Sequence, residues 1–446
     1  MNKNSINAIS PIDGRYSTQT DCLSEFFSEK ALIKFRLKVE VEYFIKLTEI
    51  GINQLSDWNK KNNPTLRNIY DNFNDSHANE IKKIEKTTNH DVKAVEYFLK
   101  NKFKSLGFEK YSEFIHFGLT SQDINNTAIP LSLKEYFNSY YDLLENLLKH
   151  LKDKSVEYKD VTILARTHGQ PASPTKLGKE FNVFIVRVEE QLKYLKKIPF
   201  SAKFGGATGN FNAHHIAYPE IDWKKFAESF VKNMGLSLSF PTTQIEHYDN
   251  LAAIFDNIKR INSIIIDFNQ DMWLYISMDY FKQKIKKGEI GSSAMPHKVN
   301  PIDFENAEGN LGLANAIFHY MSSKLPISRL QRDLSDSTVV RNIGVPLGHS
   351  LLSYKSILKG LKKLIPNDIV IEKDLEDNYV VIMEGIQTIL RKYKYKNAYE
   401  EIKEFTRGRE LTKKNILDFI NNLSVKEEIK DELKQITPTN YYGNIL

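Results

Sequence analysis

Five stretches of the sequence gather ionisable and small polar residues where the helical pattern is interrupted. The densest is GSSAMPHKVNP, residues 291–301, in which Pro296 and Pro301 exclude a continuous helix. Glycine and proline are expected in any loop between helices. The two serines, the histidine, the lysine and the asparagine are not explained by a loop alone. They indicate a functional site, because loops on rigid scaffolds often carry chemistry.

A second stretch, ARTHGQPASPT at residues 165–175, contains a candidate acid or base. His168 is flanked by Arg166, Thr167 and Gln170, which can fix the tautomer of the imidazole. We expect this histidine in a turn that enters a long helix. An imidazole titrates near neutral pH and therefore suits proton transfer. The alternative is a histidine with a structural role.

Two further stretches combine helix starts with chemistry. In HFGLTSQDINNT, the Thr120-x-x-Asp123 spacing predicts a helix capping box. The N-terminus of such a helix offers free N–H groups to a carboxylate or phosphate. In TTNHDVKAVEYFL, His90 and Asp91 can form an imidazole–carboxylate pair or simply cap a helix.

The fifth stretch, QRDLSDSTVVRN at residues 331–342, carries arginines suited to an anion. Ser337 and Arg341 are four residues apart and share one face if the stretch is helical, and Arg332 stands just upstream. A guanidinium binds carboxylate or phosphate through two parallel N–H bonds. The alternative is a surface cluster of ion pairs.

Long helices must position these stretches, because apolar residues recur every three or four positions over four long segments. These four stripes cover residues 133–151, 177–195, 251–275 and 304–325. Ile264, Ile266 and Trp273 lie beside the third stripe and widen its apolar face, which indicates burial on several sides.

We therefore predict an all-α fold with three helical domains, at residues 1–112, 113–365 and 366–446. The central domain is expected to be a bundle of long helices that pack like a coiled coil and continue across a subunit interface as a multi-helix core. Pro366 marks the second joint, because proline ends a helix. A short strand is expected at Val161-Thr162-Ile163-Leu164.

The composition excludes several classes of protein. The 446 residues include one cysteine, Cys22, so neither an intrachain disulfide nor a cysteine metal cluster can form. The net charge of +6 is small and interspersed, whereas a nucleic-acid binder gathers basic residues into a stripe. We expect no signal peptide and no membrane span. These features favour a cytoplasmic protein without nucleic-acid or membrane partners; the rival is a helical scaffold or RNA-binding protein that uses the basic surface.

Three of the stretches together resemble the fumarase/aspartase superfamily. The pattern Gly291-Ser292-x-x-Met295-x-x-Lys298-x-Asn300 resembles its signature loop, and the Thr120-Ser121 and Thr167-His168 stretches resemble its other two shared regions, in the same order. Five sequence segments are similar to the adenylosuccinate lyase family of the bacterial type: SPIDGRY, TTNHDVKAVEYFL, RTHGQPASP, TTQIEHYDN and GSSAMPHKVNPIDFEN. The similarity covers nearly the whole chain.

This resemblance implies a β-elimination that releases fumarate. Adenylosuccinate would give AMP, and succinyl-aminoimidazole-carboxamide ribotide would give the carboxamide ribotide, both in purine nucleotide biosynthesis. By similarity Ser292 is the base and His168 is the acid. The choice of Ser292 over Ser293 depends on the family alignment alone, and a serine base needs activation.

The resemblance also implies roles for other residues. Lys298 and Asn300 suit the charge that develops on the carboxylate, Glu305 is expected to orient His168, and His90 is counted as catalytic too. The family's substrate-binding positions match fourteen residues here: Arg15, Tyr16, Asn89, His90, Asp91, Thr120, Ser121, Gln244, Met295, Lys298, Asn300, Arg332, Ser337 and Arg341.

Finally, the resemblance implies small-molecule nucleotide substrates, no cofactor and no metal. It implies a homotetramer in which three chains build each active site. The nearest alternative is another fumarate-releasing lyase, such as argininosuccinate lyase. A third hypothesis keeps the fold without the catalysis, and the intact His168, Ser292 and Lys298 argue against it.

Overall fold

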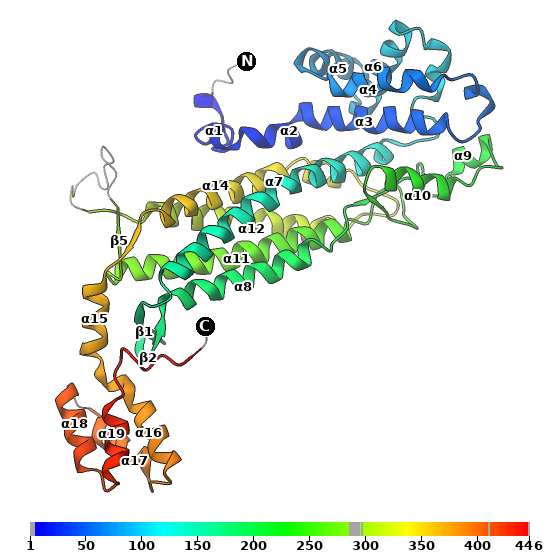
Figure 1. Ribbon diagram of the computed structural model, residues 1–446. Coiled ribbons are helices and arrows are strands. Elements are labelled where there is room, and N and C mark those ends of the chain that lie inside the picture. The colour runs from blue at the N-terminus through cyan, green and yellow to red at the C-terminus, as the bar shows by residue number, and fades with distance from the viewer. Residues whose placement is uncertain (1–4, 285–294, 296–297, 409–410, 445–446) are drawn as a thin grey trace. The chain divides into compact units, whose positions relative to one another are not determined.

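Long helices dominate the computed structural model, which describes residues 5–284, 295, 298–408 and 411–444. The four predicted stripes lie on four helices (Figure 1): α7 (Ser121–Glu157), α8 (Leu177–Leu195), α11 (Asp249–Ser277) and α12 (Ile302–Lys324). A further long helix is α14 (Gly344–Leu361). The stripe on α11 is buried at Ile258, Ile261 and Met272, as an amphipathic helix requires.

The chain divides into two compact units, each made of segments far apart in the sequence. The first consists of Met1–Leu144, Gln191–Ser263 and Gly309–Tyr354, and the second of Glu145–Glu190, Ile264–Glu308 and Lys355–Leu446. Each of the long helices contributes residues to both units. Most of the predicted substrate residues belong to the first unit, whereas the predicted acid His168 belongs to the second.

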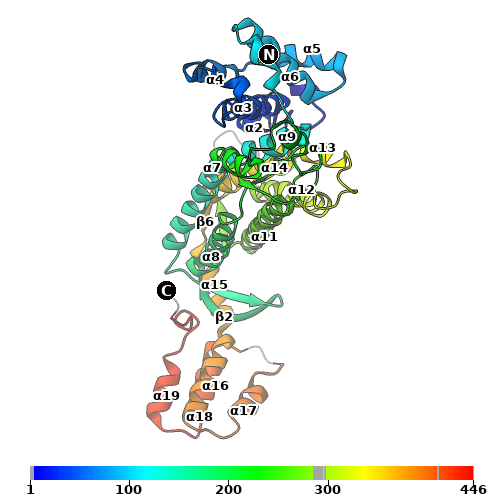
Figure 2. The same cartoon turned by 90° about the vertical axis from the view of Figure 1, so that its right-hand side faces the viewer.

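The N-terminal part of the first unit is built around α3 (Glu29–Leu47). Ser28 caps this helix, because its hydroxyl accepts the N–H of Ala31 at 3.1 Å. Three helices pack on it (Figure 2): α4 (Asn63–Asp71), α5 (Asp75–Thr88) and α6 (Asp91–Ser105). Short elements complete this part: η1 (Ser5–Asn7), α1 (Ser17–Thr20), η2 (Asp21–Leu23), α2 (Ser24–Phe27), η3 (Asn53–Leu55), η4 (Lys60–Asn62) and η5 (Glu109–Phe114).

The same core extends to α10 (Trp223–Asn233), which starts at Asp222 with a side-chain cap to the N–H of Lys225. The rings of Phe226 on α10 and Tyr43 on α3 lie 5.9 Å apart, edge to face. The remaining elements of this unit are α9 (Asn212–Ala217), α13 (Ser335–Val340) and the parallel pair β3 (Ser201–Ala202) and β4 (Ser237–Leu238).

The second unit contains two antiparallel strand pairs. β1 (Thr162–Thr167) pairs with β2 (Gln170–Lys176), and β5 (Phe281–Gln283) pairs with β6 (Leu364–Pro366). The short strand predicted at residues 161–164 is confirmed, and it extends to Thr167. Pro366 ends β6, so the chain passes from α14 to α15 (Asp368–Asp377) through a strand.

The C-terminal helices of the second unit share a small core of their own, in which Ile386, Ile416 and Leu433 are fully buried. Its elements are η6 (Tyr379–Ile382), α16 (Met383–Lys392), α17 (Ala398–Thr406), α18 (Lys413–Asn422) and α19 (Glu427–Lys434). Thr412 and Asn415 form a capping box at the start of α18.

The all-α prediction is therefore confirmed, with three small two-stranded sheets in the described residues. The three-domain division at residues 112 and 365 stays a prediction. None of the helices in the described ranges combines the length and the apolar character that a bilayer crossing requires.

Candidate active site

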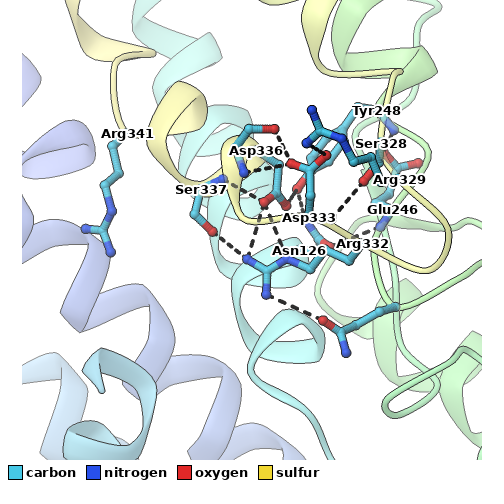
Figure 3. A network of polar contacts seen from close by, with 12 residues as sticks. Asn126, Glu246, Tyr248, Ser328, Arg329, Arg332, Asp333, Asp336, Ser337 and Arg341 are labelled. Carbon is cyan, nitrogen blue, oxygen red and sulfur yellow. Dashed lines mark hydrogen bonds and ion pairs between the residues drawn. The ribbon is translucent and has the colours of Figure 1, made fainter. Parts of the chain in front are cut away.

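Arg332 is the centre of a polar cluster in the segment around α13 (Figure 3). Its Nη2 donates to Ser337 Oγ at 2.7 Å and to Asp336 Oδ1 at 3.3 Å, and its Nη1 donates to Gln244 Oε1 at 3.5 Å. With its oxygen turned toward Arg332, the amide of Gln122 accepts from Nη1 at 3.1 Å. The structure thus brings together three predicted substrate residues, Gln244, Arg332 and Ser337.

Asp336 links this cluster to a buried polar chain. Its Oδ2 accepts the hydroxyl of Tyr248 at 3.0 Å, and that hydroxyl accepts Nδ2 of Asn126 at 2.7 Å. Asn126 Oδ1 accepts the backbone N–H of Glu246 at 3.0 Å. Burial raises the pKa of Tyr248, and the charge of Asp336 raises it further, so the phenol remains a donor. This chain fixes the segment that carries Gln244 against α7 and α13.

Arg341 belongs to a second cluster, and Figure 3 shows it directed away from Arg332. Its Nη2 donates to Asp91 Oδ2 at 2.6 Å and its Nη1 to Glu29 Oε2 at 3.0 Å. Arg36 of α3 donates to the same Asp91 oxygen at 2.7 Å. Burial alone would raise the pKa of Asp91, but the charge and hydrogen bond of Arg36 outweigh burial, and the pKa falls to about 2. Asp91 is therefore ionised at neutral pH and holds two guanidinium groups.

His90 caps α6, which is the simpler of the two roles expected for it. Its Nδ1 accepts the backbone N–H of Lys93 at 3.2 Å and lies 3.8 Å from Asp91 Oδ1. A ring nitrogen that accepts an N–H bond carries no proton, so the proton of the neutral ring is on Nε2. Asn89 precedes it in the left-handed region at φ 53° and ends α5. Both side chains are exposed and can meet a ligand.

Thr120 and Ser121 lie at the start of α7, next to a buried ion pair. Asp123 accepts the backbone N–H of Thr120 at 2.8 Å, which is the acidic half of the predicted capping box. The same carboxylate accepts Lys203 Nζ at 2.8 Å and the N–H of Gly205 at 2.8 Å. Asp123 and Lys203 are both 0% exposed. The sequence pattern revealed the cap, but not Lys203, which lies 80 positions away.

The turn that leads into α7, residues 116–120, packs on a buried histidine. Tyr43 donates its hydroxyl proton to the carbonyl of Phe117 at 2.6 Å, and its oxygen lies 3.1 Å from His214 Nε2. Nε2 is therefore the donor in that pair, and Nδ1 is buried without a partner in the described residues. Burial lowers the pKa of His214 to about 4. Gly118 is required here, because a Cβ would lie 2.7 Å from His214 Nε2.

His168 lies at the tip of the β1–β2 hairpin. Thr167 pairs with Gln170, so His168 and Gly169 form a two-residue turn, with φ 55° and 74°. Two positive φ angles are typical of the type I′ turn that closes such hairpins. The expected position in a turn entering a helix is wrong, because β2 intervenes and α8 starts only at Leu177. The ring of His168 is exposed and has no polar partner within the described ranges.

Polar contacts brace both strands of this hairpin, whereas the ring of His168 at its tip is exposed. Arg166 Nη2 donates to Asp374 Oδ2 of α15 at 2.6 Å, and Asn378 Nδ2 donates to the other oxygen of Asp374 at 3.0 Å. On the second strand, Ser173 Oγ donates to Glu384 of α16 at 2.5 Å. Strand residues on both sides of the turn are thus held to α15 and α16, while the imidazole itself is exposed.

The residues of the predicted signature loop are only partly described. Ser292 and Ser293 lie outside the described residues. Met295 and Lys298 are exposed, Asn300 is half-buried, and the N–H of Lys298 donates to the carbonyl of Met295 at 3.0 Å.

Glu305 lies in the first turn of α12, where its Oε1 accepts the indole N–H of Trp273 at 3.0 Å. The described part of the chain contains no hydrogen bond between Glu305 and His168. Orientation of His168 by Glu305 therefore stays a prediction.

Arg15 and Tyr16 lie on the turn before α1, with the guanidinium carbon of Arg15 5.7 Å from the centre of the Tyr16 ring. Within the described ranges no three His, Cys, Asp or Glu side chains are grouped so that they could hold a metal ion.

Sequence reasoning missed the residues that hold the predicted ones in place. These are Arg36, Asp123 as an ion-pair partner, Lys203, Tyr248 and Asp336. One sequence signal could have found part of this network. The run QDINN lies at the start of α7, where a buried helix usually has apolar residues. Gln122, Asp123, Asn125 and Asn126 are all buried.

Comparisons with known proteins agree with this architecture. Two family models match most of the chain, one described as Lyase over residues 14–316 and one described as Adenylosuccinate lyase C-terminal over residues 328–442. A crystal structure of fumarate lyase from Mesorhizobium sp. BNC1 has a TM-score of 0.75 at 16% identity and covers 95% of both chains. At that identity the likeness shows the fold alone.

Sequence relatives are much closer. The adenylosuccinate lyase of Dictyostelium discoideum is 56% identical over 454 residues, which cover 99% of this chain and 97% of that one. The adenylosuccinate lyase of Escherichia coli (strain K12) is 46% identical over 452 residues, which cover 100% of this chain and 98% of that one. From these matches over its whole length, the chain belongs to the adenylosuccinate lyase family.

Proposed function

We propose that this chain is a carbon–nitrogen lyase of purine nucleotide biosynthesis. It removes fumarate from adenylosuccinate to give AMP, and from succinyl-aminoimidazole-carboxamide ribotide to give the carboxamide ribotide. The observation that carries this proposal is the 56% identity, over 99% of the chain, to a relative named adenylosuccinate lyase.

The reaction makes four demands on the site. A base removes a proton from the carbon beside a succinyl carboxylate, and the electron pair of that C–H bond forms the double bond of fumarate. The C–N bond breaks, its electron pair leaves with nitrogen, and an acid protonates that nitrogen. Charge that develops on the carboxylate needs cations or N–H donors. The phosphate and purine of the nucleotide need a binding surface.

We assign the acid to His168 and the base to Ser292. The position of His168 supports its role, because an exposed imidazole on a two-residue turn can be directed at a ligand without burying a charge. Lys298 and Asn300 are assigned to the carboxylate. His90, whose Nε2 carries the proton of the neutral ring when Nδ1 caps α6, is assigned to the site as a further donor.

The two arginine clusters of the first unit are assigned to the anionic groups of the nucleotide. Arg332 presents its guanidinium group beside the neutral side chains of Ser337 and Gln244, and Arg341 presents its own beside the carboxylate of Asp91. A guanidinium suits bidentate binding of phosphate and carboxylate. The start of α7 adds the hydroxyl groups of Thr120 and Ser121 for a carboxylate, since the backbone N–H of Thr120 is already bonded to Asp123.

We further propose a homotetramer in which three chains build each site, in the cytoplasm. The exposed tip that carries His168 supports shared sites, because an imidazole without neighbours needs another surface to enclose the reaction. Several apolar side chains on the long helices are also between 39% and 55% exposed, which another copy would cover: Val183, Val186, Leu274, Leu313 and Tyr320.

The first test follows the absorbance change when the purified protein is added to adenylosuccinate, beside Ser292→Ala and Ser293→Ala. Conversion to AMP and fumarate that is lost only in Ser292→Ala supports both the reaction and the base. A wild type that converts no adenylosuccinate contradicts the proposed substrate, and argininosuccinate is then tested.

Shared sites are tested by mixing two inactive variants. His168→Ala and Ser292→Ala supply the intact half that the other lacks, so mixed tetramers regain part of the activity. Mixtures that refold together and stay inactive contradict the sharing of sites between chains.

A further inference from the structure

Two arginines share one carboxylate in the first unit, and they differ in what can reach them. Arg36 Nη2 lies 2.7 Å and Arg341 Nη2 lies 2.6 Å from the same Oδ2 of Asp91. The side chain of Arg36 is 2% exposed, whereas that of Arg341 is 39% exposed. A ligand can therefore contact Arg341 and cannot contact Arg36.

Arg36 joins three helices through one planar group. It lies on α3, donates through Nη2 to Asp91 at the start of α6, and donates through Nε to Asn125 Oδ1 on α7 at 2.8 Å. The fixed fork of a guanidinium sets the angle between these two bonds. A lysine at this position has one charged nitrogen at the end of a flexible stem, so it can keep the charge but not the angle.

Stability of the fold does not explain this buried arginine. Burial lowers its pKa, and Nη1 is buried without a hydrogen-bond partner in the described part of the chain. A buried N–H without a partner is unfavourable, and a buried ion pair that apolar residues replace as a whole often costs no stability. The position of Asp91 is what Arg36 secures.

Both carboxylates that hold Arg341 keep a cationic partner if a ligand takes Arg341 from them, although Lys82 then serves Glu85 as well as Glu29. Glu29, which accepts Arg341 Nη1 at 3.0 Å, also pairs with Lys82 Nζ at 3.3 Å. Asp91 in turn keeps its bond to Arg36. No carboxylate is left unpaired to repel the anion that takes Arg341.

We propose that Arg36 is a positioning residue for the anion site of the substrate. It fixes Asp91, Asp91 sets the resting orientation of Arg341, and Arg36 remains on Asp91 when a phosphate or carboxylate of the substrate binds Arg341. This inference rests on the proposed function, because it assumes an anionic substrate at Arg341. It places the effect of Arg36 in binding and not in proton transfer.

The test compares Arg36→Lys and Arg36→Met with the wild type in steady-state turnover of adenylosuccinate. KM rises about 10-fold in both, which corresponds to about 1.4 kcal/mol, while kcat changes less than about 3-fold and both variants stay folded at the assay temperature. The control is Arg67→Met, which removes another arginine–carboxylate pair that involves α3, that of Arg67 with Glu42. It leaves KM unchanged.

A double-mutant cycle separates positioning from a merely structural role. Because Arg36 acts through Asp91, Arg36→Lys changes KM less than about 2-fold in an Asp91→Asn background. An equal rise in both backgrounds, or no rise in the wild-type background, overturns the inference. If both Arg36 variants fail to fold, Asn125→Ala removes the second hydrogen bond of the Arg36 guanidinium. An unchanged KM in that variant overturns the inference equally.

Binding of products distinguishes this inference from the proposed function. Calorimetry with AMP and with fumarate gives dissociation constants without turnover, and the product that Arg36→Lys weakens identifies the group at Arg341. A wild type that binds AMP but converts no adenylosuccinate contradicts the function alone. If the wild type turns over and Arg36→Lys binds both products equally well, the positioning role alone fails.

Discussion

The predicted binding arginines of the first unit and the predicted acid of the second unit are arranged in opposite ways. In the first unit the predicted binding residues are tied to other residues: Arg332 to Asp336 and Ser337, and Arg341 to Asp91. In the second unit His168 is exposed on a hairpin tip and has no polar partner among the described residues.

This difference agrees with the roles that we propose for these groups. A binding arginine has to be held in one orientation before the substrate arrives. A paired carboxylate holds it there and balances its positive charge. An acid that transfers a proton has to change its protonation state, and a fixed ion pair would oppose that change. We therefore expect changes in the first unit to alter stability or affinity, and changes at the hairpin tip to alter rate.

The largest expected effect is on rate, at the tip. His168→Ala lowers kcat by ~10²–10⁴-fold, the range for a general acid or base, and leaves the melting temperature unchanged because the ring is exposed. His150→Ala, which removes another histidine of the second unit, is the control and keeps kcat. Near-normal turnover in His168→Ala would remove it from the mechanism.

The next effect is on stability, in the first unit. Asp123→Asn takes the charge from a fully buried carboxylate and leaves Lys203 without its counter-ion. Loss of one partner of a buried ion pair costs about 3–5 kcal/mol, which urea unfolding measures. Glu49→Gln, which removes the exposed partner of Lys46, is the control and unfolds like the wild type. An equally stable Asp123→Asn contradicts the role of this pair in holding α7.

A pH dependence of stability follows from His214. Its pKa is about 4 in the folded chain, against 6.5 for the free side chain, because burial disfavours the charged ring. Between these values the unfolded chain binds the proton and the folded chain does not, so stability falls as the pH falls, by about 3 kcal/mol at most. His214→Gln keeps a hydrogen-bond donor for Tyr43. The free energy of unfolding of this variant depends less on pH between pH 6.5 and 4. A wild type and variant with parallel curves would exclude His214 as the cause.

The sequence predicted what depends on local pattern. Apolar residues at helical spacing placed α7, α8, α11 and α12, because burial of one face is encoded every three or four residues. The contacts that hold the site join residues far apart in the chain. Arg36 and Asp91 are 55 positions apart, and Asp123 and Lys203 are 80 apart. No local pattern reports such a pair.

The hairpin was missed for a different reason. Its second strand contains Pro171 and Pro174, and proline is rare within sheets because it lacks the N–H that a ladder needs. In a ribbon of only two strands, both strands are edges, and a proline can direct its ring to the open side. The prolines that suggested a turn into a helix are therefore compatible with β2.

The smallest expected effect is at the turn that presents His168. Gly169 has φ 74°, and a Cβ there would meet nothing within 4 Å, so the cost of a side chain is conformational alone. Gly169→Ala should lower stability by roughly 1 kcal/mol, since the left-handed region is unfavourable for alanine. Gly169→Asn should lose less, because asparagine tolerates that region. Both variants keep a measurable kcat if the residue at position 169 serves only to form the turn. A loss of kcat as large as in His168→Ala, with stability kept, would mean that the backbone of this turn itself takes part in positioning the acid.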